Sequence, residues 1–190
     1  MSKIILMVDG ENFLHKVEDV LTTKDKSRGI TNTVNINFNK LFSGALKGIK
    51  ISNKVFYGAK LHFNPDTPKK SQELIKAQRK LINNLRQHKF EFIMAGNVRG
   101  QKVGNKMIFK EKGVDVRIAV DLVTLACDKK INTVVLCSSD SDLQPAIIEA
   151  KKRKVQVIYL GFEHQPNKGL TFTANRTILL RDSEIIESCS

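Results

Sequence analysis

The chain has 190 residues, 41% of them hydrophobic, which suits one domain spanning residues 1–190 with a core that needs no disulfides. Its formal net charge of +13 at pH 7 favours polyanionic partners, either nucleic acid or an anionic membrane. No stretch is long and apolar enough to span a bilayer, and the three cysteines lack metal-ligand spacing. We therefore expect a cytoplasmic protein with buried free thiols and no membrane partner.

The first predicted element is a buried strand at 3–8, followed by Asp9-Gly10-Glu11-Asn12 and a helix at 13–21. A glycine directly after an aspartate allows a tight turn that brings the backbone close to a ligand. Asp9 is explained equally well as a simple helix cap. A functional role is less favoured for Glu11 than for Asp9, because carboxylates are common in the first turns of helices.

Polar and amphipathic segments follow. We expect a basic loop at 22–35, a helix at 37–47, a strand at 51–59 and a long helix at 69–88 that begins after Thr67 and Pro68. The long helix carries Lys76 and Arg79 among several cations outside its apolar stripe. A solvated helix face is the usual meaning of such a run, and contact with phosphates is the second interpretation.

Residues 90–97 predict a third strand that continues into a hairpin, with its turn near Gly104 and Asn105. The segment 98–112 is strongly basic. We expect it to form a flap beside the site at the sheet edge and to attract a polyanion through Arg99, Lys102, Lys106, Lys110 and Lys112.

The most apolar helix of the chain begins near Lys112-Gly113-Val114-Asp115, and its few polar positions predict that it is largely buried. Asp115 is either the N-cap of this helix or a site residue. Asp121 can pair with Arg117 one turn earlier. Because Asp115 and Asp121 do not share a face of an ideal helix, we favour Asp115 for the site.

The central motif lies at 134–142. Val134 to Cys137 is a short, β-branched apolar run typical of a strand buried on both faces, and it is followed by Ser138-Ser139-Asp140-Ser141-Asp142 and a helix at 143–152. Asp140 and Asp142 therefore lie at the carboxyl edge of an α/β sheet, where such folds bind ligands. Two carboxylates this close repel each other unless a cation lies between them, which indicates a divalent metal.

A strand at 155–160, a short helical segment at 170–174 and a last strand at 177–180 complete the pattern, and we expect the tail at 182–190 to be frayed. Strands that alternate with helices predict an α/β fold, a three-layer α/β/α sandwich with a mainly parallel central sheet. The strands that end near Asp9 and Asp140 must be neighbours or near neighbours for these carboxylates to meet.

Four carboxylates form the catalytic and metal-binding site that we predict: Asp9, Asp115, Asp140 and Asp142. Hard oxygen ligands of this kind suit Mg²⁺ or Mn²⁺. Ions held by aspartates can activate a water and stabilise the leaving oxygen of a phosphodiester. The sequence shows neither a Ser-His-Asp or Cys-His arrangement nor a glycine-rich phosphate loop.

Three motifs, Asp9-Gly10-Glu11-Asn12, Lys112-Gly113-Val114-Asp115 and Ser139-Asp140-Ser141-Asp142, occur in the order and spacing of the NYN domain family of PIN-like nuclease domains. Essentially the whole chain resembles this family. The resemblance implies a PIN-like fold and a metal-dependent, usually RNA-directed, nuclease site built on the four aspartates. It gives Asn12 the role of orienting Asp9 and makes Asp121 a secondary candidate. Ser139 stands where the family often has glycine. Relatives with this fold often pair, which implies a homodimer.

Three functions compete. The first is a metal-dependent ribonuclease acting on single-stranded or structured RNA, and the second is a non-catalytic RNA-binding module with a PIN-like fold. The intact acidic set favours the enzyme, since a binding module has no need of converging carboxylates. The third is a phosphohydrolase of the haloacid dehalogenase type. That mechanism requires an Asp-x-Asp motif, which Asp9-Gly10-Glu11 does not provide, and the net charge of +13 suits a polymer better than a small metabolite.

Overall fold

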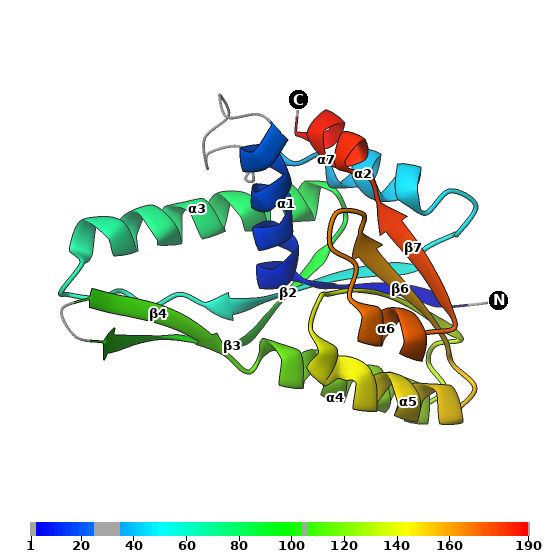
Figure 1. The fold of residues 1–190 in the computed structure, drawn as a ribbon. Helices are drawn as coiled ribbons and strands as arrows, with labels where there is room; N and C mark the ends of the chain where they lie inside the picture. The colour runs from blue at the N-terminus through cyan, green and yellow to red at the C-terminus, as the bar shows by residue number, and fades with distance from the viewer. Residues whose placement is uncertain (1–2, 25–34, 104–105, 190) are drawn as a thin grey trace.

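In the part of the chain that the structure describes, seven strands form one sheet with helices on both faces (Figure 1). The structure is a computed structural model that describes residues 3–24, 35–103 and 106–189, and at 99–111 it describes only the backbone. Residues 25–34 of the predicted basic loop and the predicted turn at Gly104 and Asn105 lie outside the described residues. The strands are β1 (Ile4–Asp9), β2 (Asn53–Lys60), β3 (Glu91–Val103), β4 (Lys106–Lys112), β5 (Thr133–Cys137), β6 (Gln156–Phe162) and β7 (Arg176–Leu180). The helices are α1 (Gly10–Lys24), α2 (Phe38–Ala45), α3 (Pro68–Gln87), α4 (Val114–Cys127), α5 (Gln144–Lys152), α6 (Lys168–Thr173) and α7 (Asp182–Ser188), and the 3-10 turn η2 (Ser141–Leu143) precedes α5.

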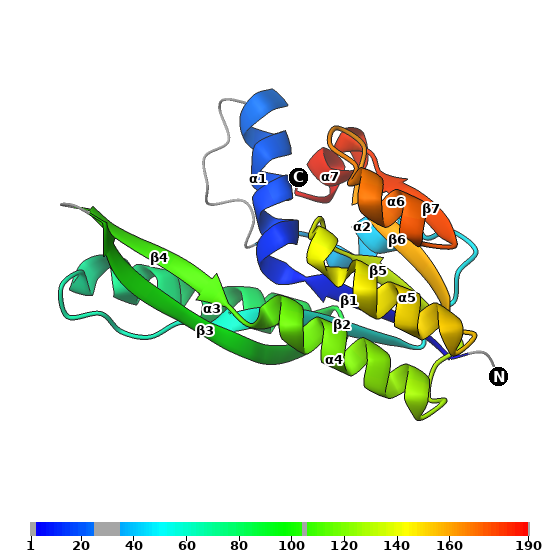
Figure 2. The same ribbon diagram turned by 60° about the horizontal axis from the view of Figure 1, so that its bottom comes forward.

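The strand order is β4-β3-β2-β1-β5-β6-β7, and every neighbouring pair is parallel except β3 and β4. The predicted three-layer sandwich with a mainly parallel sheet is therefore confirmed. Helices α1, α2, α3 and α7 cover one face, and α4, α5 and α6 cover the other (Figures 1 and 2). β1 and β5 are neighbours, with Val8 opposite Cys137, so the carboxyl ends of these two strands meet, as the predicted site requires.

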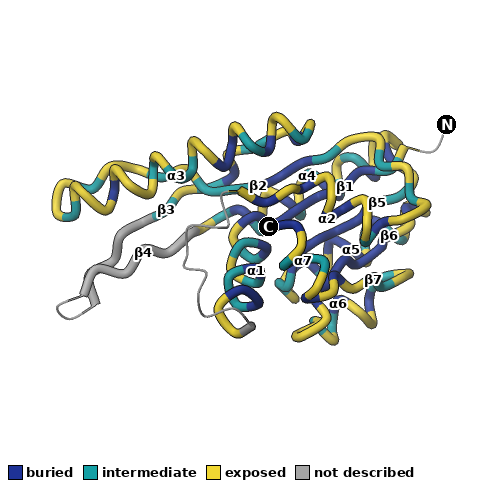
Figure 3. Tube along the Cα trace, turned by 90° about the horizontal axis from the view of Figure 1, so that it is seen from above, coloured by how far each residue is buried: buried dark blue, intermediate teal, exposed yellow. Residues whose placement is uncertain are grey.

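The central strands are buried on both faces because each supplies side chains alternately to two cores. In β1, Leu6 and Val8 pack toward α1 and α2, whereas Ile5 and Met7 pack toward α4 and α5. These side chains are at most 6% exposed, which explains why the strand has a continuous apolar sequence. Figure 3 shows the burial of the central strands beside the largely exposed outer side of α3.

α1 follows β1 without a loop and begins at Gly10, earlier than the sequence predicted. A Cβ atom at Gly10 would lie 2.3 Å from Cε1 of Phe56 and 2.4 Å from the carbonyl oxygen of Tyr57. Only glycine allows this close approach of the new helix to β2. The first turn of α1 is thereby held against the sheet, directly beside Asp9.

The β3–β4 hairpin and the outer part of α3 extend away from the rest of the molecule (Figures 1 and 2). The hairpin pairs Asn97 with Lys112 at its base and Val103 with Lys106 near its tip. The predicted hairpin is therefore confirmed, and its antiparallel strand β4 forms one edge of the sheet.

The prediction of a frayed tail at 182–190 is wrong. Residues 182–188 form α7, in which Ile185 is fully buried, and Cys189 beyond it is 9% exposed. These two side chains are one helical turn apart, so together they cover the core beside α1 and α2. The side chain of Glu184 accepts a hydrogen bond from the backbone N–H of Arg181 at 2.9 Å, which fixes the start of the helix.

α4 and one cysteine are more exposed than predicted. Val116 and Val120 on α4 are 60% and 54% exposed, so this helix is buried only on its sheet-facing side. An apolar sequence alone cannot distinguish a helix buried all round from one with an apolar outer face. Cys137 and Cys189 are buried as expected, but Cys127 is exposed.

Candidate metal centre

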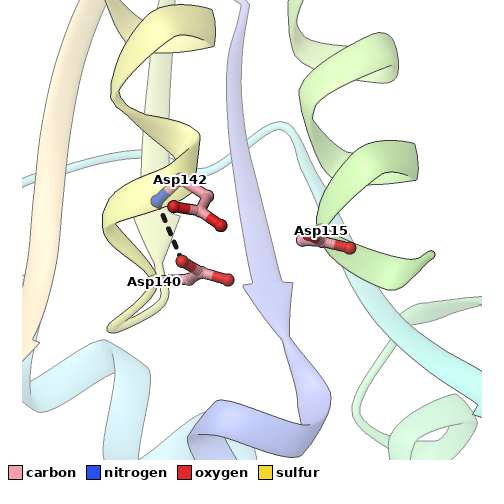
Figure 4. Close-up of side chains that lie close together, drawn as sticks. All are labelled: Asp115, Asp140 and Asp142. Atoms are coloured by element: carbon pink, nitrogen blue, oxygen red, sulfur yellow. Dashed lines mark hydrogen bonds between the residues drawn. The ribbon is translucent and has the colours of Figure 1, made fainter. Parts of the chain in front are cut away.

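Three aspartates meet at the carboxyl edge of the sheet. Single carboxylate oxygens of Asp115, Asp140 and Asp142 all lie within 4.8 Å of one another (Figure 4). Asp140 and Asp142 come from the segment after β5, and Asp115 comes from the first turn of α4. Asp115 and Asp140 are half-buried, whereas Asp142 is exposed. The group is thus supported by the protein on one side and open to solvent on the other.

The turn after β5 sets the spacing of Asp140 and Asp142. Asp140 is the N-cap of η2, and its Oδ1 atom accepts a hydrogen bond from the backbone N–H of Asp142 at 2.8 Å. An aspartate is well suited to this position because its short carboxylate reaches the free N–H groups of the turn. The same bond keeps the two residues close and uses only one of the two carboxylate oxygens of Asp140.

Two glycines set the position of Asp115. Gly113 is the N-cap of α4 with a φ of 99°, so Asp115 is not the cap but lies in the first helical turn. Gly96, on β3, has a φ of 102°, and a Cβ atom there would lie 2.3 Å from the carbonyl oxygen of Lys112. The close contact between β3 and the end of β4 thus requires glycine and directs α4 toward the site.

Asp9 lies behind the three aspartates and is only 3% exposed. Its Oδ2 atom accepts hydrogen bonds from Nδ2 of Asn12 at 2.8 Å and from the hydroxyl of Ser138 at 2.9 Å. The hydroxyl oxygen of Ser138 in turn accepts a hydrogen bond from the backbone N–H of Asp140 at 3.1 Å. Asp9 is therefore linked to Asp140 through Ser138, and it does not belong to the group of three closely spaced carboxylates.

The charge of Asp9 also affects its neighbour on β5. Burial raises the pKa of the Cys137 thiol, and the negative charge of Asp9 raises it further. This thiol therefore stays protonated at neutral pH and cannot serve as a nucleophile. The carboxylates therefore remain candidates at this edge of the sheet, whereas Cys137 does not.

The two remaining candidates, Asp121 and Ser139, differ in their contacts. Oδ1 of Asp121 accepts a hydrogen bond from Nε of Arg117 at 2.8 Å, as the sequence predicted. Asp121 also hydrogen-bonds the Tyr57 hydroxyl, whose pKa is raised by burial and then by this carboxylate. The hydroxyl oxygen of Ser139 is buried and has no hydrogen-bond partner among the described residues.

Two residues that support the turn after β5, Ser138 and Asn167, are not recognisable from local sequence patterns. Ser138 is 1% exposed and bridges Asp9 and Asp140, but a serine after a buried strand resembles an ordinary loop residue. The side chain of Asn167 donates a hydrogen bond to the carbonyl oxygen of Ser139 at 2.9 Å and also caps α6. Only a pairing of segments distant in the sequence reveals this role.

The predicted RNA-binding cations lie on two elements. Lys76 and Arg79 are exposed on α3, and Lys112 is exposed at the end of β4. Arg99, Lys102, Lys106 and Lys110 lie on the backbone of the β3–β4 hairpin, and their side chains are outside the described part of the structure.

The group of three carboxylates fits a small divalent cation. With bonds of about 2.1 Å, neighbouring oxygens around Mg²⁺ are roughly 3.0 Å apart and opposite oxygens roughly 4.2 Å apart. Carboxylate oxygens that lie within 4.8 Å of one another can approach these spacings by rotation of the side chains. A donor set made only of carboxylates suits hard ions such as Mg²⁺ and Mn²⁺.

The fold and the group of carboxylates place this protein among α/β/α sandwich domains that have an acidic site at the carboxyl edge of the sheet. The NYN domain profile matches residues 3–181, nearly the whole chain, and the chain belongs to the NYN domain family. NYN domains are generally nucleases. A crystal structure of a protein of unknown function from Vibrio parahaemolyticus is similar, with a TM-score of 0.62 and 19% identity over 94% of this chain and 93% of that chain, and this likeness shows a common fold. No curated protein matches the sequence.

Within the described ranges, none of the helices combines the length and apolar character that crossing a membrane requires.

Proposed function

We propose that this protein is a Mg²⁺- or Mn²⁺-dependent ribonuclease that hydrolyses RNA phosphodiester bonds at the acidic group. The observation that carries the proposal is the grouping of Asp115, Asp140 and Asp142 at one sheet edge in a chain of net charge +13. The basic protein attracts a polyanion such as RNA. The acidic group suits a cation, which would lie between the carboxylates and the phosphates of that polyanion. The nuclease character of the family supports the same conclusion.

The residues divide the work by position. Asp115, Asp140 and Asp142 hold the cation, which when bound supplies an activated water and stabilises the leaving oxygen. Asp9 and its partner Asn12 help to fix the position of Asp140, because the Ser138 hydroxyl hydrogen-bonds both Asp9 and the backbone N–H of Asp140. Lys112, exposed beside the start of α4, attracts the RNA phosphates.

The test is cleavage of labelled single-stranded and structured RNA in Mg²⁺ or Mn²⁺, with and without EDTA. Asp140→Asn keeps the size of the side chain and removes a ligand charge, so we expect cleavage to fall by more than about 100-fold, beyond the range of outer-shell changes. The matched control is Asp128→Asn, which changes an exposed carboxylate at the far end of α4 that pairs with Lys130. This control should cleave like the unaltered protein.

Retained cleavage by Asp140→Asn would place the active site elsewhere. Binding of RNA without cleavage in any metal would instead support the non-catalytic RNA-binding module. Equal losses in Asp140→Asn and Asp128→Asn would indicate a general effect of charge rather than loss of a ligand.

A further inference from the structure

A groove with apolar walls lies between α1 and α3, on the face of the sheet opposite α4. Its main part has a volume of about 410 Å³ and begins at Gly10 and Glu11, directly after Asp9. A second hollow of about 210 Å³, at the connection between β2 and α3, shares Leu61, Leu74 and Val98 with the first. We call the two together the α1–α3 groove. Figure 3 shows α1 and α3 over the same face of the sheet.

The α1–α3 groove presents aromatic and apolar side chains to solvent. Phe63, at the outer end, is 53% exposed, and Leu74 is 41% exposed. The Phe92 ring forms part of the lining and stacks on Phe56 with a centroid distance of 6.1 Å. Gly58 makes room for this ring, since a Cβ atom there would lie 2.7 Å from Cζ of Phe92. Flat, apolar surfaces of this kind suit a planar ring system.

A row of polar and basic residues leads from the acidic group toward the outer end of the groove. The register of the sheet aligns Lys60 with Asn97 and Asn97 with Lys112 across three strands. Nε2 of His62 lies 3.1 Å from Oδ1 of Asn97. Asp9 is opposite Tyr57 in the register, so Lys60 lies roughly 10 Å farther along, at about 3.3 Å per residue.

Charged side chains make the row of basic residues and the interior of the groove suitable for different parts of a ligand. Lys60 and Lys112 are exposed and attract phosphates. Inside the groove, Glu11 and Glu18 on the α1 side repel phosphates, although they leave uncharged rings unaffected. A polymer with an anionic backbone and uncharged planar side groups satisfies both surfaces at once.

We propose that the α1–α3 groove binds an unpaired nucleobase of the RNA strand, with Phe63 as a stacking surface. The proposal rests on the proposed ribonuclease function and adds a preference for single strands. A base in a duplex is stacked and paired and cannot enter the groove, whereas an unpaired base turns out of the strand and stacks on an aromatic ring.

The test measures binding in EDTA, so its result does not depend on cleavage. Phe63→Ala is compared with Phe63→Tyr, which keeps the ring, and with Phe172→Ala, which removes a 91% exposed ring on α6, away from the groove. The probes are a fluorescent single-stranded RNA and a base-free oligomer of abasic sugar phosphates of the same length. Thermal unfolding of each variant verifies its fold.

We expect Phe63→Ala to bind single-stranded RNA about tenfold more weakly, within the range for loss of one stacked base. Phe63→Tyr and Phe172→Ala should bind like the unaltered protein. The base-free oligomer should bind the unaltered protein and Phe63→Ala equally, because neither complex contains a stacked base.

Unchanged binding of RNA by Phe63→Ala, or an equal loss for RNA and the base-free oligomer, would overturn the nucleobase site. Such a result would leave the ribonuclease proposal intact, because that proposal is judged by metal-dependent cleavage. Conversely, a chain that binds RNA through Phe63 but does not cleave it would retain the groove site and lose the enzymatic function. Failure of the unaltered protein to bind RNA would overturn both.

Discussion

Ser138 connects two of the aspartates through a single hydroxyl group. It donates to Oδ2 of Asp9 at 2.9 Å and accepts from the backbone N–H of Asp140 at 3.1 Å. Its side chain is buried, so water cannot replace these bonds without rearrangement of the turn. The position of Asp140 therefore depends on a residue that does not itself belong to the acidic group.

We predict that Ser138→Ala weakens Mn²⁺ binding by about tenfold, within the 10- to 100-fold range found for outer-shell partners of metal ligands. The measurement is calorimetric titration of Mn²⁺ into each variant. Ser139→Ala is the matched control, because the neighbouring hydroxyl is buried without a hydrogen-bond partner among the described residues. Its removal should leave Mn²⁺ affinity unchanged and stability equal or slightly higher. Equal losses in both variants would show that Ser138 has no specific positioning role.

At the scale of single residues, the sequence predicted which side chains form the acidic site better than it predicted where each of them lies. The strand-to-helix junctions predicted carboxylates at one sheet edge, and the structure brings Asp115, Asp140 and Asp142 together there. The deeper place of Asp9 and the bridge through Ser138 depend on side-chain directions at the ends of two strands. Those directions follow from the pairing of β1 with β5, which no local sequence pattern specifies.

Among the elements, the junction of β3, β4 and α4 depends on backbone shape. Gly96 and Gly113 both have positive φ values, and the carbonyl oxygen of Lys112 occupies the place where a side chain at Gly96 would begin. L-residues rarely adopt such a conformation, and here the space is also filled. The junction then delivers Asp115 to the site.

We predict that Gly96→Ala lowers the free energy of unfolding by roughly 3 kcal/mol or more, since it combines unfavourable φ with a backbone clash. Gly48→Ala is the control, because Gly48 also has a positive φ, 84°, but open space around it. That variant should lose only about 1 kcal/mol. Urea unfolding of both variants measures the difference. Similar losses of unfolding free energy in the two variants would mean that the β3–β4 junction accommodates the added methyl group without strain.

α7 gives a second prediction at the scale of elements. Ile185→Ala should lower the free energy of unfolding by about 2–5 kcal/mol, because it leaves a cavity in the core. Ile148→Ala removes an isoleucine side chain that is 48% exposed on α5 and should cost less than about 1 kcal/mol. Equal midpoints in urea would show that α7 does not contribute to the folded core.

The elements that the sequence predicted best are those with strong periodicity. The buried strands and the long helix α3 were recognised from their apolar spacing, and the hairpin from its central glycine and asparagine. α7 was missed because it is short and mostly polar, and its buried isoleucine has meaning only beside α1 and α2. The exposed valines of α4 show the same limit, since what covers a helix is decided by distant parts of the chain.

At the scale of the whole molecule, the net charge of +13 should dominate the strength of RNA binding. We predict that the logarithm of affinity falls linearly with the logarithm of salt concentration, by about 0.7 for each phosphate neutralised on a single strand. Lys112→Gln should reduce this slope by about 0.7, because Lys112 is exposed next to the site. Binding measured by fluorescence anisotropy at several KCl concentrations in EDTA gives the slope.

The matched control for Lys112→Gln is Lys3→Gln, at the opposite, amino edge of the sheet. Both variants lose one charge, but only Lys112 lies on the expected RNA path. An identical change of slope in the two variants would show that RNA responds to total charge and follows no defined path. A slope independent of salt would contradict electrostatic binding altogether.

The order of strands also bears on the time at which this protein becomes complete during its synthesis. β1 lies at the centre of the sheet, and β2 and β3, on one side of it, are made before β5, on the other. Pairing of β1 with β5 must wait for α4 and most of the chain, and such distant contacts form late. Asp140 and Asp142 reach Asp115 only at that stage. A growing chain can therefore form its basic hairpin while it is still unable to assemble the acidic group, so the proposed RNA-binding surface exists before the proposed cleavage site.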